Sequence, residues 1–102
     1  MSKPLIVSIP HSLGKEEALR RLKSGMARVL GGIPVLKVDE QTWSGDRMSF
    51  KVRALGQVAS GTVDVAEDNV RLEVTLPLLL KKFAQIVQRG MTEGTRRLLE
   101  KK

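Results

Sequence analysis

The spacing of apolar residues changes along the chain and marks successive elements of secondary structure. Leu5, Val7 and Ile9 recur every second residue before Pro10, which predicts a short strand near the start of the chain. Between residues 15 and 30, apolar residues recur at the spacing of an α-helix, while the basic residues fall mainly on the other side. The apolar set of this predicted amphipathic helix is Ala18, Leu19, Leu22, Met26, Val29 and Leu30.

The ends of this first helix are marked by residues with known positional preferences. Ser12 is the expected N-cap, because its hydroxyl can accept a hydrogen bond from a free backbone N–H. Glu16 and Glu17 follow near the positive end of the helix dipole, where anions are stabilising. Gly31-Gly32 predicts the end of the helix.

From residue 35 to residue 76 the apolar residues follow a two-residue period, which is typical of strands with one buried face. The alternating runs lie near residues 36–39, 48–54, 63–65 and 70–76, with turn-forming residues near 44–46, 55–57 and 67–69. Connections this short join antiparallel neighbours. The segment therefore predicts a four-stranded meander whose apolar face needs cover from helices.

A second amphipathic helix is predicted from Pro77 onward, since proline is well tolerated at a first helical position. Its apolar stripe comprises Leu80, Ala84, Val87, Met91 and Leu98, widened by Leu79, Phe83 and Ile86. Gly90 and Gly94 each lower helix stability by about 1 kcal/mol relative to alanine. We therefore expect this helix to bend or fray beyond Gly90.

Together these elements predict an α+β fold in a single domain, residues 1–102. An antiparallel β-meander packs against two helices in the order β-α-β-β-β-β-α, like a reduced helix-grip fold. The alternation places Phe50, Val52, Val63, Leu72 and Val74 on one sheet face, against Leu22, Met26, Leu80, Phe83 and Val87 of the helices.

Composition narrows the class of protein. Hydrophobic residues make up 41% of the chain and aromatic residues only 3%, so aliphatic residues and methionine must build the core. The absence of cysteine excludes disulfides, thiolate metal sites and cysteine nucleophiles. The apolar runs fall far short of the roughly 20 residues of a membrane span, and the first residues do not resemble a signal peptide. We expect a cytoplasmic protein that is soluble or at most peripheral.

The excess positive charge belongs to the two helices. The chain carries 18 Lys and Arg against 11 Asp and Glu, a formal net charge of +7. Residues 77–102 contribute +5, from seven bases and two acids, whereas residues 31–76 contribute −2. We predict a basic binding face formed by Lys81, Lys82, Arg89, Arg96 and Arg97.

Two interpretations of this basic face are open. It is either a solvated surface that keeps the protein soluble, or a surface that attracts nucleic acid, anionic lipid or an acidic partner. Nucleic acid is the least favoured of these, because Trp43 and Phe50 are predicted to lie in the sheet and not to be available for base stacking. The sequence also has no helix-turn-helix or zinc-finger spacing.

Candidate catalytic chemistry is sparse. His11 follows a predicted strand, where it could act as a general base, but no nucleophile is tied to it, so a capping or surface role is favoured. Asp64, Glu67 and Asp68 form a local carboxylate cluster that suits a turn better than paired acid–base work. We predict no catalytic residues, no cofactor and no metal site, and therefore no enzyme.

Several local patterns together resemble one bacterial family, the polyhydroxyalkanoic acid system proteins, also described as polyhydroxyalkanoate granule region proteins. The patterns are KPLIVSIPH at residues 3–11, LGKEEA at 13–18 with Arg20-Arg21, WSGDRMSF at 43–50, GTVDV at 61–65 and LPLLL at 76–80. The resemblance covers nearly the whole chain and implies a link to storage-polyester granules. It implies a context more than a mechanism, and it carries over no catalytic residues.

Residues and resemblance lead to one main hypothesis and two alternatives. The main one is a non-enzymatic accessory or binding protein that contacts a polyhydroxyalkanoate granule surface, or a granule-associated protein, through its basic helical face. The alternatives are a carrier of small hydrophobic ligands with a helix-grip-like cavity, which we expect side chains to fill, and a nucleic-acid-binding module. The sheet edges and the last helix, including Leu78 and Leu99, could also support a weak homodimer.

Overall fold

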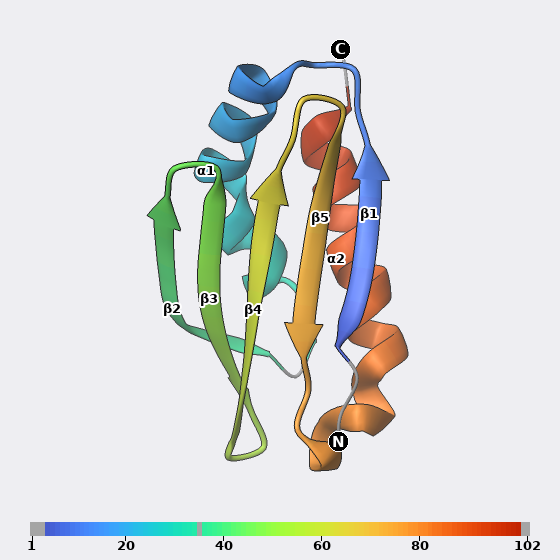
Figure 1. The fold of residues 1–102 in the computed structure, drawn as a ribbon. Coiled ribbons are helices and arrows are strands. Elements are labelled where there is room, and N and C mark those ends of the chain that lie inside the picture. The colour runs from blue at the N-terminus through green and yellow to red at the C-terminus, as the bar shows by residue number, and fades with distance from the viewer. Residues whose placement is uncertain (1–3, 35, 101–102) are drawn as a thin grey trace.

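The computed structural model describes residues 4–34 and 36–100 and contains one antiparallel sheet with two α-helices on one face (Figure 1). The elements are β1 (Leu5–Pro10), α1 (Lys15–Gly31), β2 (Lys37–Ser44), β3 (Arg47–Ala54), β4 (Gln57–Val65), β5 (Asn69–Thr75), the 3₁₀ helix η1 (Leu78–Phe83) and α2 (Ala84–Leu99). The predicted α+β class and element order are confirmed. Lys3, Val35, Lys101 and Lys102, which belong to segments of the predicted fold, lie outside the described residues.

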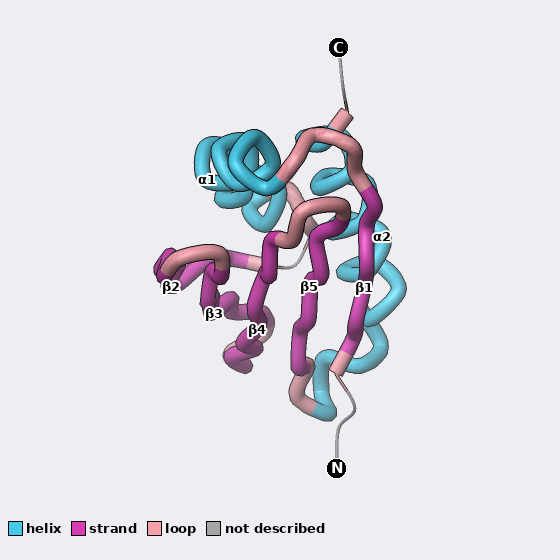
Figure 2. Tube along the Cα trace, turned by 45° about the horizontal axis from the view of Figure 1, so that its top comes forward, coloured by secondary structure: helices cyan, strands magenta, loops and turns pink. Residues whose placement is uncertain are grey.

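The five strands are arranged in the order β1-β5-β4-β3-β2, so the first strand joins the far side of the meander (Figure 2). β1 pairs with β5, with Val7 opposite Leu72. β2 forms the other edge, where the register shifts between Val38 and Glu40. Charged side chains and an irregular register on an edge strand both discourage pairing with a second copy.

The two faces of the sheet differ because side chains alternate along each strand. In β3, Met48, Phe50 and Val52 are buried beneath the helices, while Ser49 and Lys51 are exposed on the open face. The predicted core is confirmed. All its members are buried, except that Phe83 is half-buried and packs against the others.

Glycines allow α1 and α2 to pack closely against each other. A Cβ atom at Gly94 would lie 2.7 Å from Cγ1 of Val29, and one at Gly90 would lie 2.6 Å from Cγ1 of Ile33. On the other helix, Gly25 faces the side chain of Leu98 in the same way. The expectation of fraying beyond Gly90 is wrong, because α2 stays helical as far as Leu99. Val29 of α1 and Ile33, just after α1, pack over these glycines.

The predicted N-cap of α1 is also wrong. The cap position is Gly14, which forms no side-chain cap, and Ser12 lies exposed outside the helix. The backbone N–H of Lys15 donates to Oε1 of Glu67 at 3.3 Å. A carboxylate from the β4–β5 turn therefore satisfies a free helical N–H that Ser12 was expected to satisfy.

The segment after β5 starts as a 3₁₀ helix and not as an α-helix, which changes the side chains that it buries. With three residues per turn, Leu80 and Phe83 share a side, and both contact the core. Leu79, which was expected to widen the apolar stripe, is exposed instead, as are Leu78 and Ile86. Leu99, expected as an apolar position outside the core, is buried in it.

The β3–β4 turn contains an unusual leucine. Its two central residues, Leu55 and Gly56, have φ angles of 53° and 78°, as in the type I′ turn of a two-residue hairpin. Asparagine and glycine are preferred at such positions, and a side chain such as leucine costs roughly 1–2 kcal/mol in the left-handed region. Among the residues that the structure describes, Leu55 is the one residue other than glycine that has a positive φ angle.

Candidate functional site

All five residues of the predicted basic face are exposed. Lys81 and Lys82 lie in η1, and Arg89, Arg96 and Arg97 lie in α2. The opposite side of these helices carries Leu80, Val87, Met91, Thr95 and Leu99, which are buried against the sheet. Burial of the apolar stripe therefore turns the bases toward solvent.

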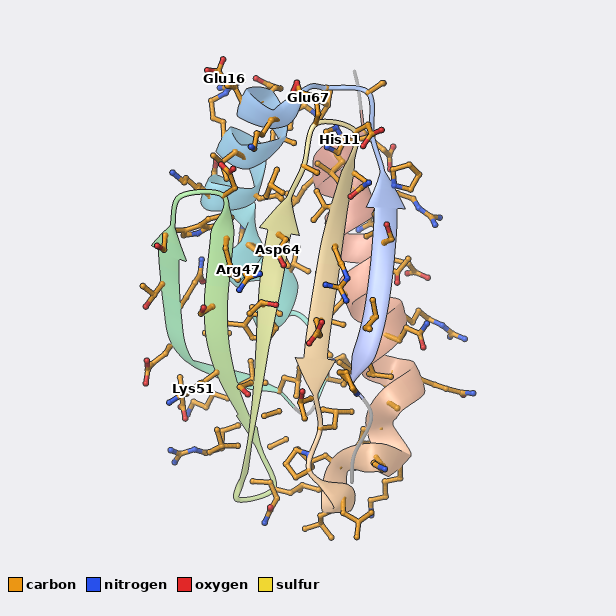
Figure 3. All side chains as sticks on the ribbon, viewed as in Figure 1. His11, Glu16, Arg47, Lys51, Asp64 and Glu67 are labelled. Atoms are coloured by element: carbon orange, nitrogen blue, oxygen red, sulfur yellow. The ribbon has the colours of Figure 1, made fainter. Side chains whose placement is uncertain are left out.

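The basic face differs from most bases of the sheet in lacking ion-pair partners. Within residues 4–34 and 36–100, none of its five members forms a salt bridge. On the open face of the sheet, by contrast, Arg47 is paired with Asp64 at 2.6 Å, as Figure 3 shows. The other pairs there are Arg53–Asp39 at 3.1 Å, Arg71–Glu73 at 3.2 Å and Lys51–Glu40 at 3.8 Å.

Two of the paired bases show the electrostatic effect of their partners. The hydrogen bond from Arg47 to Asp64 raises the pKa of the guanidinium, and the nearby charge of the carboxylate adds to this effect. At the start of α1, the Lys15 ammonium lies 2.6 Å from Asp46, which raises the pKa of the lysine. These bases are already engaged within the protein, and the bases of α2 remain available to an external anion.

The first helix adds positive charge beside α2. Residues 15–31 contain five bases and two acids, and residues 78–99 contain five bases and one acid, so the two segments carry +3 and +4. Their summed charge of +7 equals the formal net charge of the whole chain. The positive charge of the molecule is thus gathered on its helical layer.

A groove of about 480 Å³ runs between the two helices on their outer side. Arg28 of α1 and Arg97 of α2 both line it, together with Glu93. Arg28 was not among the residues predicted for the basic face, although it belongs to a predicted amphipathic helix. The missing information was the antiparallel packing of α1 on α2, which the helical period alone does not specify.

A hollow on the open face of the sheet is the second candidate site. It has a volume of about 310 Å³ and is lined mostly by polar residues of the four neighbouring strands β2 to β5. Its residues are Glu40, Thr42, Ser49, Phe50, Lys51, Ser60, Gly61, Thr62, Glu73 and Thr75. Threonine and serine are common on a solvated sheet face, and Lys51 is paired with Glu40. The hollow therefore offers less to an anion than the basic face does.

His11 holds two loops together through hydrogen bonds, which agrees with the capping role favoured from the sequence over a catalytic one. Its Nδ1 accepts a hydrogen bond from the backbone N–H of Leu13 at 3.2 Å. Nε2 must then carry the proton, and it donates to the carbonyl oxygen of Ala66 at 3.1 Å. The imidazole thus ties the β1–α1 loop to the β4–β5 turn.

The carboxylates flagged in the sequence are divided among separate structural tasks. Asp64 pairs with Arg47, and Glu67 accepts the N–H of Lys15. The backbone carbonyl of Asp68 accepts a hydrogen bond from the N–H of His11 at 2.9 Å. Among the described residues, no group of three or more His, Cys, Asp and Glu is placed to hold a metal ion.

Apolar side chains occupy the space between the sheet and the helices, where a helix-grip carrier would have its cavity. The largest fully buried side chains in this space include Leu22, Met26, Met48, Leu72 and Met91. Two of the three aromatic rings, Trp43 and Phe83, are half-buried, and Phe50 is buried. In the part of the chain that the structure describes, no helix has the length and apolar character needed to cross a membrane.

Comparison with known proteins gives a family for the chain. The model of the family described as "Putative polyhydroxyalkanoic acid system protein" matches residues 5–99. The comparison with curated proteins gives no match. Among solved structures, TTHA0849 from Thermus thermophilus is similar, with a TM-score of 0.37 and 12% identity over 95% of this chain and 92% of that chain. That likeness is too distant to support an argument.

The family match extends from β1 to the end of α2, so it includes every element described above. The resemblance noted from the sequence motifs is therefore confirmed across the whole fold. The chain belongs to the family of polyhydroxyalkanoic acid system proteins.

Proposed function

We propose that this protein is a non-enzymatic accessory protein of the polyhydroxyalkanoate storage system. In this proposal it acts in the cytoplasm, where its basic face binds the surface of a storage granule or a granule-associated partner. The observation that carries the proposal is the contrast between the two sides of the molecule. Four bases of the sheet, Arg47, Lys51, Arg53 and Arg71, are paired with carboxylates. By contrast, Lys81, Lys82, Arg89, Arg96 and Arg97 have no ion-pair partner among the described residues.

The physical argument rests on what these five charges do for the isolated protein. They fall within residues 81–97, where Glu93 is the one acid, so their mutual repulsion opposes folding and does not assist it. An anionic surface or acidic partner would relieve that repulsion. Such attraction is screened over about 8 Å at physiological salt, so binding should weaken as salt increases.

Co-sedimentation of the purified protein with isolated polyhydroxyalkanoate granules tests the proposal. The test variant carries Lys81→Gln, Lys82→Gln and Arg89→Gln. The matched control carries Lys37→Gln, Lys51→Gln and Arg53→Gln, three exposed bases of β2 and β3. Each variant removes three charges and so lowers the formal net charge from +7 to +4. The two variants lose the same charge at different places, and the control additionally breaks the Lys51–Glu40 and Arg53–Asp39 ion pairs.

We expect the helix variant to lose most of its granule association and the sheet control to keep it, with both variants folded by circular dichroism. The wild-type association should also fall as salt is raised. Equal sedimentation of the wild type and the folded helix variant would show that the basic face serves solubility alone.

A further inference from the structure

Exposed aliphatic side chains gather at one end of the molecule. Leu55 in the β3–β4 turn is 62% exposed, and Leu78 and Leu79 in η1 are 78% and 56% exposed. Figures 1 and 2 both place the β3–β4 turn and η1 at the same end of the sheet, the lower end in Figure 1. Val58 and Ile86, which are also exposed, belong to the strand and helix that lead away from this end.

The topology explains why these segments meet. In the antiparallel sheet, the end at which β3 stops and β4 begins is also the end at which β5 stops and leads into η1. The β2–β3 turn, the β4–β5 turn and the β1–α1 loop lie at the opposite end, where Figure 3 labels Glu16, Glu67 and His11. Among the described residues, the loops of that opposite end contain no exposed large aliphatic side chain.

Folding gives no reason for these leucines to lie in water. Leu55 occupies a left-handed turn position that asparagine would occupy with less strain. Leu78 and Leu79 precede Leu80, which is buried, so the segment already has its anchor in the core. Clustered exposed apolar residues mark a contact surface more often than singly scattered ones do.

Two lysines stand beside this apolar end. Lys81 and Lys82 are exposed and lack ion pairs within the described residues, and Nζ of Lys82 lies 5.4 Å from the centre of the Phe83 ring. Lysine can lay its methylene stem along an apolar surface while its ammonium stays in a polar layer. Apolar tips next to lysines are the pattern by which proteins bind an anionic lipid surface without crossing it. A second copy of the chain fits less well, since it would bring lysine against lysine.

We infer that this end of the molecule, formed by Leu55, Leu78, Leu79, Lys81 and Lys82, inserts into the surface of an anionic phospholipid layer. The inference rests on the proposed function and gives the granule contact a lipid partner and an orientation. The leucines enter the acyl region, and the two lysines lie among the headgroups. The axis of α2 then leads away from the surface, and Arg96 and Arg97 lie roughly 20 Å from Lys82 along it, beyond the screening length.

Flotation of the full chain with lipid vesicles tests this inference. Vesicles of phosphatidylcholine alone are compared with vesicles that also contain phosphatidylglycerol. Two variants change the apolar end, Leu55→Asn alone and Leu78→Gln with Leu79→Gln. Two further double variants each remove two positive charges. Lys81→Gln with Lys82→Gln removes them close to the proposed lipid surface, and Arg96→Gln with Arg97→Gln removes them far from it. Thermal unfolding of each variant verifies its fold, and Leu55→Asn should be at least as stable as the wild type.

We expect the wild type to bind the anionic vesicles and to bind the neutral ones weakly. Loss of Leu78 and Leu79 should lower binding by roughly tenfold or more, because both side chains would no longer be buried in the lipid. Leu55→Asn should weaken binding, and the Lys81/Lys82 pair should matter more than the Arg96/Arg97 pair.

Three results would overturn the inference. The first is no binding of the wild type to anionic vesicles, and the second is equal loss from the near and far charge pairs. The third is a concentration-dependent dimer in sedimentation equilibrium that the leucine variants abolish, which would assign this end to self-association. If granule association still depends on the basic face in any of these cases, the proposed function stands and only the lipid partner fails.

Discussion

The ring of Phe50 in β3 lies over Gly61, its cross-strand neighbour in β4. Both residues belong to the sheet face beneath the helices, where Phe50 is buried. A Cβ atom added at Gly61 would collide with the ring of Phe50 and with the backbone carbonyl of Glu73. The buried aromatic ring of the core is thus accommodated by the absence of a side chain on the next strand.

Gly61→Ala should therefore destabilise the protein by about 1–3 kcal/mol, as overpacking of a core does. The strand backbone of β5 is one of the two obstacles, so a change of rotamer at Phe50 cannot relieve the whole collision. Urea denaturation measures the effect. Gly31→Ala is the control, because outside the adjoining residues and backbone of its own helix no atom lies within 4 Å of the position of the added Cβ there. A Gly61→Ala midpoint equal to that of the wild type would contradict the packing described here.

Gly94→Ala should destabilise the protein, although in an exposed helix the same change would add up to about 1 kcal/mol of stability. The sign is reversed because the new methyl group would lie 2.7 Å from Cγ1 of Val29 in α1. A double-mutant cycle with Val29→Ala tests this explanation. Since Val29→Ala removes the obstructing atoms, the double variant should be more stable than the sum of the two single losses predicts. Strict additivity would place the cause elsewhere.

His11→Ala should cost about 1–2 kcal/mol of folding stability, because the N–H of Leu13 and the carbonyl of Ala66 both lose a partner. The variant should still associate with granules as the wild type does, since His11 lies at the opposite end of the sheet from η1. Ser12→Ala, which changes an exposed neighbour, is the control and should be nearly neutral. Normal stability combined with lost association would instead give His11 a functional role.

Glu17 should make stability depend on acid pH. Hydrogen bonds from Arg20 at 2.7 Å and from Arg21 at 2.9 Å lower the pKa of this carboxyl below its ordinary value of 4.5. The folded state therefore favours the ionised form, and protonation favours unfolding. The stabilisation is complete above pH 4.5 and is lost as pH falls through the lower pKa of the folded state.

Comparison of the wild type with Glu17→Gln isolates this effect. The difference between their free energies of unfolding should be constant near neutral pH and should shrink as pH falls below 4.5. Because Arg21 also donates to the carbonyl of Glu100 at 2.6 Å, the variant should loosen the contact of α1 with the end of α2. A difference that grows toward acid pH would have the wrong sign for this explanation.

The pattern of apolar residues was sufficient to predict the element order and the core. A two-residue period selects one face of β3 for burial, and that face is the one holding Phe50 and Val52. The role of Gly90 and Gly94 could not be predicted in this way. Helix propensity describes a helix in water, whereas these glycines are required by Val29 of α1 and by Ile33, which follows α1. A contact between residues far apart in sequence leaves no period to detect.

The candidate site was predictable to the same extent. Exposure of Lys81, Lys82, Arg89, Arg96 and Arg97 follows from the amphipathic period of the last segment. The ion pairs of Arg47, Lys51, Arg53 and Arg71 could not be predicted from this period, because they depend on which strands are neighbours and on how far the side chains reach. Leu79 was misplaced because an α-helical period was assumed where the chain forms a 3₁₀ turn.

The pairing of β1 with β5 and the packing of α1 on α2 join the two ends of the chain, and this has a consequence for biosynthesis. A nascent chain that ends before β5 lacks both the strand that pairs with β1 and the helix α2 that packs on α1. The five-stranded sheet is complete only after β5 emerges, and the part of its apolar face that α2 covers stays open until α2 follows. Folds that depend on such distant contacts form slowly and expose apolar surface meanwhile. Vulnerability to aggregation should therefore be greatest in chains truncated ahead of α2, whichever strands they already contain.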